Sequence, residues 1–169
     1  MTGTGLPDSG GVSTLEQEQA RVRGLQAQTD TLADAADPET IALAAARLGA
    51  RSVAFTYNDP VIFLEYAIDV AQACRAHGIK TVAVTAGYVT PEPRDEFFRH
   101  MDAANIDLKS LDDEIYLKLN AGKLEPVLNT LKTLKKTGIW YEIVVLLIPT
   151  LNDSNHEIRD MCEWIKSEL

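Results

Sequence analysis

Asp107 and Lys109 are the two residues in this sequence whose types and spacing most directly suggest chemistry. They lie within and just after the apolar run Asn105–Leu108, and residues two apart on an extended strand point to the same side. A carboxylate and an ammonium group at the mouth of a strand can bind a ligand amine or carboxylate, or the lysine can form a Schiff base. A structural ion pair is the alternative, and these two residues alone leave the choice open.

Three further polar clusters also follow short apolar runs. Asn58, Asp59 and Pro60 follow Ser52–Tyr57, Thr85-Ala86-Gly87-Tyr88 follow Thr81–Val84, and residues 149–153 follow Ile143–Ile148. The runs are rich in β-branched residues and separated by helical patterns, which is typical of repeated βα units. Because the carboxyl ends of parallel strands line up on one face, we predict that the clusters meet at one site. Taken singly, residues 58–60 and 152–154 could simply begin helices.

The predicted fold is α/β, with about four parallel βα units that form a partial (βα) TIM-barrel-like core or an open sheet. A closed barrel of eight units needs about 250 residues, more than this chain has. Helices are expected over residues 38–48, Val61–His77, 91–101, Leu111–Leu119, Leu124–Lys136 and His156–Leu169. Tyr141–Ile148 is almost unbroken apolar sequence, which predicts a strand buried on both faces.

Composition divides the chain near residue 33. Residues 1–33 are predicted to be disordered or loosely helical, because Thr2–Ser13 is rich in Gly, Ser, Thr and Pro, and Leu15–Leu32 has a sparse apolar face. Residues 34–169 are predicted to form the incomplete barrel, with clear structure from about Asp37.

Charge and composition exclude several classes of function. The formal net charge of −9 argues against a nucleic-acid partner. No apolar stretch approaches the roughly 18 residues of a membrane span, and no signal peptide is evident, so a cytoplasmic protein is expected. The two cysteines, Cys74 and Cys162, are far apart and are predicted to be buried free thiols. The three histidines have no partner spacing, so no metal site is predicted.

Several segments in order resemble a known family over roughly four-fifths of the chain. They are Ser52–Pro60, Val84–Tyr88, Asn105–Lys109, Leu124–Leu128 and Leu147–Ser154. Together these segments resemble the radical S-adenosylmethionine (SAM) enzymes. Within that superfamily they look like the relatives of pyruvate formate-lyase activating enzyme, and especially the AmmeMemoRadiSam-system radical SAM proteins.

The resemblance implies a partial (βα)6 barrel that holds SAM and a [4Fe–4S] cluster, and reductive cleavage of SAM to a 5′-deoxyadenosyl radical. It implies that Asn58, Asp59 and Pro60 belong to the segment that receives the methionyl amine. Thr85 and Gly87 match the segment near the ribose. Asp107 and Lys109 match an Asp-Leu-Lys motif whose lysine can meet the methionine carboxylate, and a protein substrate or partner is implied as well.

The departures from the family pattern separate two hypotheses. Such enzymes hold the cluster through a CxxxCxxC motif, which this sequence lacks, so no cluster is expected in this chain. Asp59 and Ala86 also stand where relatives more often carry Glu and Asn. The first hypothesis is a radical SAM enzyme by descent, present as a fragment or a degenerate form. The second is a non-catalytic βα domain that binds a nucleoside or a protein partner. A Schiff-base lyase using Lys109 is a third, weaker idea.

Overall fold

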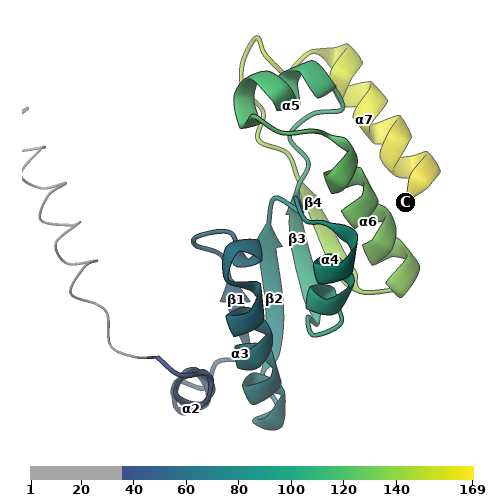
Figure 1. Ribbon diagram of the computed structural model, residues 1–169. Coiled ribbons are helices and arrows are strands. Elements are labelled where there is room, and N and C mark those ends of the chain that lie inside the picture. Colours follow the sequence, from purple (N-terminus) through teal and green to yellow (C-terminus); the bar gives the residue numbers. More distant parts are fainter. Residues whose placement is uncertain (1–35) are drawn as a thin grey trace, which may run out of the picture. The chain divides into compact units, whose positions relative to one another are not determined.

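A parallel sheet of four strands, in the order β1-β2-β3-β4, organises the described part of the chain. The strands are β1 (Ser52–Phe55), β2 (Lys80–Thr85), β3 (Ala103–Asp107) and β4 (Trp140–Val144). The structure is a computed structural model that describes residues 36–169 (Figure 1). The parallel α/β architecture predicted from the sequence is confirmed.

Every connection between successive strands contains a helix, which returns the chain to the start of the next strand. The helices are α2 (Pro38–Arg47), the 3-10 helix η1 (Pro60–Phe63), α3 (Leu64–Ala76), α4 (Pro91–Phe98), α5 (Asp113–Asn120), α6 (Glu125–Thr137) and α7 (Asn155–Glu168). These bounds lie close to the predicted ones, with the difference that the second predicted helix opens with a 3-10 turn at Pro60.

Local sequence signals account for the helix ends. Asp37 caps α2 by accepting a hydrogen bond from the Thr40 backbone N–H at 3.0 Å. The hydrogen bond from the Thr40 hydroxyl, together with this backbone contact, lowers the pKa of the Asp37 carboxyl. Ser154 and Glu157 form a reciprocal capping box at the start of α7. Gly138 ends α6 at a φ of +75°, a left-handed conformation that glycine adopts without strain.

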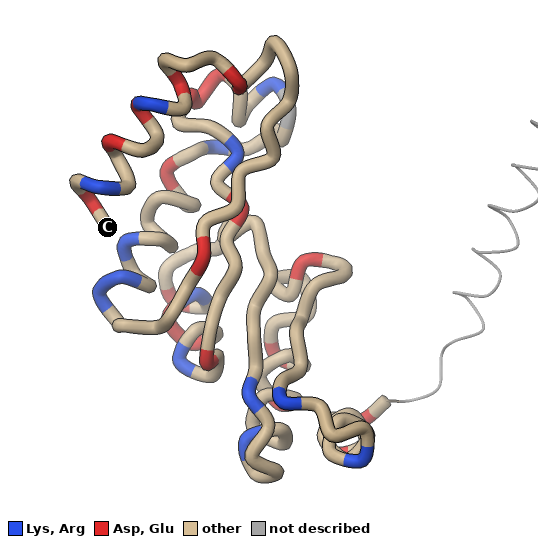
Figure 2. Tube along the Cα trace, turned by 180° about the vertical axis from the view of Figure 1, so that it is seen from behind, with Lys and Arg blue, Asp and Glu red and all other residues tan. Residues whose placement is uncertain are grey.

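One face of the sheet is buried beneath helices and the other is not. Phe55, Ala83, Ala104 and Ile106 alternate along the covered face, under the layer of α3, α4 and α6 (Figure 1). The residues between them, which include Asn105 and Asp107, are only half-buried. Figure 2 views the sheet from behind, where no described helix lies in front of the strands. In a complete barrel this second face would be the interior.

Two strands end earlier than predicted. β1 stops at Phe55 rather than Tyr57, and the Tyr57 side chain is 95% exposed. The prediction of a doubly buried strand over Tyr141–Ile148 is wrong, because β4 ends at Val144 and its residues alternate between half-buried and exposed. The physical reason is that β4 is an edge strand with one uncovered face among the described residues. The apolar residues beyond Val144 leave the sheet, and the backbone of Leu146 and Ile148 hydrogen-bonds the Asn152 side chain instead.

The predictions for residues 1–33 lie outside the described residues. Residues 37–169 form one compact unit. Over residues 36–169, none of the helices combines the length and apolar character that a bilayer crossing requires.

Candidate functional site

Asp59 ties together the loops that follow β1 and β2. Its carboxylate accepts hydrogen bonds from the Thr85 hydroxyl at 2.7 Å, the Ala86 backbone N–H at 2.8 Å and the Val61 backbone N–H at 3.1 Å. The last of these contacts caps η1, so the predicted helix-start role of Asp59 is confirmed. Because three donors already engage the carboxylate, its first role is to hold two strand ends at a fixed separation.

Gly87 allows the turn after β2, residues 85–88, to pack closely against β3 and α6. Its φ is +67°, and a Cβ added there would lie 3.1 Å from Cγ2 of Ile106 and 3.4 Å from Cγ2 of Thr130. The Thr130 hydroxyl donates a hydrogen bond to the Gly87 carbonyl at 2.8 Å. Thr85 supports the same turn, since its buried hydroxyl accepts a hydrogen bond from the Gly87 N–H at 3.1 Å.

Asp107 and Lys109 form an ion pair, with 2.8 Å between Lys109 Nζ and Asp107 Oδ2. Their side chains are partly accessible, at 41% and 32% exposure, so a ligand can reach both charges. The two residues therefore do lie on the same side, as their spacing predicts.

Two adjoining cavities open at this place. One, of about 450 Å³, is lined by Thr56, Tyr57, Asn58, Asp59, Val84, Thr85, Ala86 and Asp107. The other, of about 330 Å³, shares Ala86 and Asp107 with the first and adds Lys109, Tyr88, Tyr116, Val127 and residues 120–122. The predicted residues Asn58, Asp59, Thr85, Asp107 and Lys109 thus come together, whereas Pro60 and Gly87 are buried and do not line these two cavities.

Two further residues support the site: Tyr116, which no sequence pattern indicated, and Asn152, which was predicted only as part of a polar cluster. Tyr116 on α5 is 3% exposed, and its hydroxyl accepts a hydrogen bond from the Lys109 backbone N–H at 3.1 Å. Asn152 is also 3% exposed, and its amide donates to the Lys109 carbonyl at 2.8 Å. Asn152 belongs to the polar cluster of residues 149–153 that was predicted to meet the others, although residues 152–154 taken singly could simply begin a helix. Its position after an apolar run was the available signal, while nothing local to Tyr116 indicated its contact.

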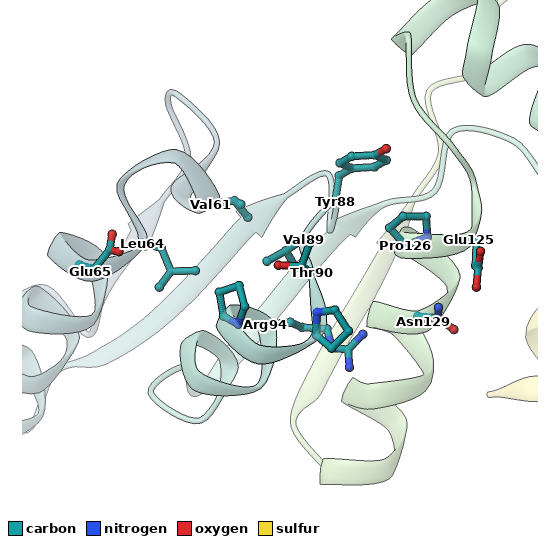
Figure 3. A pocket seen from close by; sticks show the side chains of 12 residues that line it. Val61, Leu64, Glu65, Tyr88, Val89, Thr90, Arg94, Glu125, Pro126 and Asn129 are labelled. Carbon is teal, nitrogen blue, oxygen red and sulfur yellow. The ribbon is translucent and has the colours of Figure 1, made fainter.

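A separate groove of about 620 Å³ lies on the outer, helical side of the sheet (Figure 3). Val61, Leu64 and Val89 form part of its wall, and Arg94 and Glu125 lie at its border. Tyr88 lines both this groove and the smaller inner cavity. None of the predicted site residues lines the groove, so the candidate site is the inner pair of cavities.

The thiols of this chain do not fit a cluster site. Cys74 is fully buried in α3, as predicted, whereas Cys162 is exposed on α7, so the prediction that both are buried is wrong for Cys162. Met161, one residue before it, takes the buried position on α7. Among residues 36–169, no group of three His, Cys, Asp or Glu side chains is placed to hold a metal ion.

Residues 26–165 match the radical SAM superfamily, and the chain belongs to that family. An uncharacterized protein of Methanocaldococcus jannaschii is 35% identical over 132 residues, which cover 78% of this chain and 39% of that protein. Pyruvate formate-lyase-activating enzyme of Clostridium pasteurianum is 30% identical over 115 residues, which cover 68% of this chain and 48% of that enzyme. The family resemblance seen in the sequence is therefore confirmed, including the likeness to pyruvate formate-lyase activating enzymes.

Solved structures agree with this assignment. A domain of pyruvate-formate lyase-activating enzyme from Bacteroides vulgatus superimposes with a TM-score of 0.64 at 26% identity, covering 69% of this chain and 73% of that one. SuiB of Streptococcus suis, solved bound to S-adenosylmethionine, gives a TM-score of 0.62 over 77% of this chain and 31% of that one. At 20% identity, SuiB supports the fold alone. The chain spans less than half the length of the two curated relatives named above.

Gly87→Ala tests the close packing beneath the cavities, with Gly49→Ala as the matched control. Both glycines have a φ of +67°, but a Cβ at Gly49 would meet nothing within 4 Å. Gly49→Ala should lower the free energy of unfolding by about 1–2 kcal/mol for the left-handed backbone. Gly87→Ala should lower it by roughly a further 1–3 kcal/mol, because Ile106 and Thr130 must give way. Equal effects in urea unfolding would contradict this packing.

Proposed function

We propose that this chain is the S-adenosylmethionine-binding part of a radical SAM protein of the pyruvate formate-lyase activating-enzyme-like, AmmeMemoRadiSam type. The observation that carries the proposal is the convergence of three strand-end segments on two adjoining cavities, with the Asp107–Lys109 ion pair where the cavities meet. A protein partner is proposed by analogy, since several relatives are named as activating enzymes of other enzymes, such as 4-hydroxyphenylacetate decarboxylase. The cytoplasmic setting is proposed from the sequence alone.

The charges of the site match the methionine part of S-adenosylmethionine, which carries both an ammonium and a carboxylate group. Lys109 is suited to the ligand carboxylate, and Asp107 to the ligand ammonium. Because both residues are already paired in the free protein, an incoming zwitterion exchanges one set of opposite charges for another and leaves no charge uncompensated.

Asn58, Asp59 and Thr85 contribute in ways that differ from the charged pair. Asn58 is exposed and lines the larger cavity, so its amide is available to a ligand amine or hydroxyl. Asp59 engages three donors within the protein, so we assign it to the support of the cavity wall. Thr85 is buried and directed to Asp59, which gives it the same supporting role.

Bound S-adenosylmethionine supplies a 5′-deoxyadenosyl radical when a [4Fe–4S] cluster reduces it, but no ligand set for such a cluster is present in this sequence. Its two cysteines lie in different helices, α3 and α7. We therefore propose that the chain binds the nucleoside ligand without cleaving it, as a fragment or a degenerate relative. A non-catalytic βα domain that binds a nucleoside or a protein partner remains the alternative. A Schiff-base role for Lys109 is less favoured, because an amine held in an ion pair is not a free nucleophile.

Lys109→Ala should weaken the binding of S-adenosylmethionine about tenfold to a hundredfold, because it removes a charged hydrogen bond to the ligand carboxylate. Isothermal titration calorimetry on the purified chain measures the dissociation constant directly. Lys135→Ala is the control, since Lys135 is an exposed lysine on α6.

Two outcomes of this titration carry different meanings. If the wild type binds and Lys109→Ala binds equally well, the assignment of Lys109 is wrong. If the wild type does not bind at all, the nucleoside-binding function is wrong for this chain and a protein-binding domain becomes the better account.

Anaerobic reconstitution with iron and sulfide should give no stable cluster. The chain has only Cys74 and Cys162, and a cluster of this kind needs three thiolates close together. Iron counting and absorbance after desalting measure the outcome, with the chain carrying Cys74→Ser and Cys162→Ser as the blank. Stoichiometric iron and sulfide retained by the wild type, above that blank, would show that the proposal of a cluster-free chain is mistaken.

A further inference from the structure

We propose that Tyr116 and Asn152 are positioning residues for Lys109, and that they hold its backbone so that its ammonium group stays against Asp107. The two residues come from α5 and from the loop before α7, and they contact the backbone N–H and the backbone carbonyl of Lys109, respectively. Only the ligand-affinity part of this inference rests on the proposed function, since the geometry of Lys109 can be measured without any ligand.

Lys109 needs such support because the sheet no longer fixes it. β3 ends at Asp107, and the pairing with β4 continues for one more hydrogen bond, from the Leu108 N–H to the Val144 carbonyl at 2.9 Å. The two-residue periodicity that aligns Asp107 with Lys109 requires an extended backbone through Lys109. Beyond Leu108, side chains rather than a neighbouring strand must maintain that conformation.

The Tyr116 hydroxyl provides the first of these contacts. It accepts the Lys109 N–H at 3.1 Å from a nearly buried position. Burial raises the pKa of Tyr116 above its ordinary value of about 10, so the hydroxyl remains neutral across the range in which the protein is handled. A neutral hydroxyl accepts this hydrogen bond without adding a second negative charge beside Asp107.

Asn152 provides the second contact and joins it to the loop after β4. Its amide nitrogen donates to the carbonyls of Lys109 at 2.8 Å and Leu146 at 2.9 Å, and its amide oxygen accepts from the Ile148 N–H at 2.6 Å. All three partners of Asn152 are backbone groups, so its side chain joins the backbone that follows β3 to the backbone of the loop after β4. The loop after β4 is therefore coupled to the orientation of Lys109.

Reductive methylation of the lysines, followed residue by residue by mass spectrometry, tests the positioning without a ligand. In the wild type, Lys109 should react slowly, because its amine is paired and only 32% exposed. In Tyr116→Phe, which keeps the buried ring, Lys109 should react about threefold to tenfold faster, since one hydrogen bond that holds it is lost. The other lysines should be unchanged.

Tyr141→Phe is the matched control, because Tyr141 is half-buried on β4 and no hydrogen bond of its hydroxyl occurs among residues 36–169. It should leave the reactivity of Lys109 as in the wild type. A folded Tyr116→Phe variant whose Lys109 reacts at the wild-type rate would overturn the proposal. Should that variant not fold, Asn152→Ala is judged by the same comparison.

Calorimetry with S-adenosylhomocysteine adds the readout that depends on the proposed function. Tyr116→Phe should weaken binding about threefold to tenfold in the wild-type background and not at all in the Lys109→Ala background. An equal loss in both backgrounds would mean that Tyr116 acts on binding independently of Lys109. Absence of binding by the wild type would count against the proposed function only, and the methylation rates would still decide the positioning.

Discussion

The parallel hydrogen bonding of β3 to both its neighbours is the constraint on which the rest of the site depends. Asn105 pairs in register with Val84 on β2 and with Glu142 on β4, which fixes how far each strand extends at its carboxyl end. A shift by one residue would turn Asp107 toward the helices and bury its charge. The pairing of β1 with β2, in which Phe55 lies opposite Ala83, brings Thr85 to the level at which its hydroxyl meets Asp59.

Much of the fold could be predicted because local signals agree with it. Helix starts are marked by Asp37-Pro38, Asp59-Pro60 and Ser154, and a helix end is marked by Gly138. Each βα unit also repeats the same order of strand and helix. The end of β4 could not be predicted in this way. Val145–Ile148 are as apolar as the strand before them, and only the hydrogen bonds of the Asn152 side chain to the Leu146 carbonyl and the Ile148 N–H in the folded chain show that they form a loop.

The candidate site was predictable for the residues that sit at strand ends and not for those that support them. The ends of parallel strands must meet, so the proximity of Asn58, Thr85 and Asp107 follows from the pattern of elements. Tyr116 lies in the middle of a predicted helix, and its contact with Lys109 depends on how α5 packs. The supporting role of Asp59 was equally unpredictable, because nothing in the sequence shows that three donors will hydrogen-bond its carboxylate.

The central claim is that an S-adenosyl ligand binds at the inner cavities and not in the outer helical groove. Titration of the ¹⁵N-labelled chain with S-adenosylhomocysteine, followed by amide chemical shifts, tests it most directly. The account predicts saturable shifts at residues 57–59, 85–88 and 107–110, with little change at residues 90–94 and 125–129. Shifts confined to the latter two segments, or no shifts at all, would contradict it.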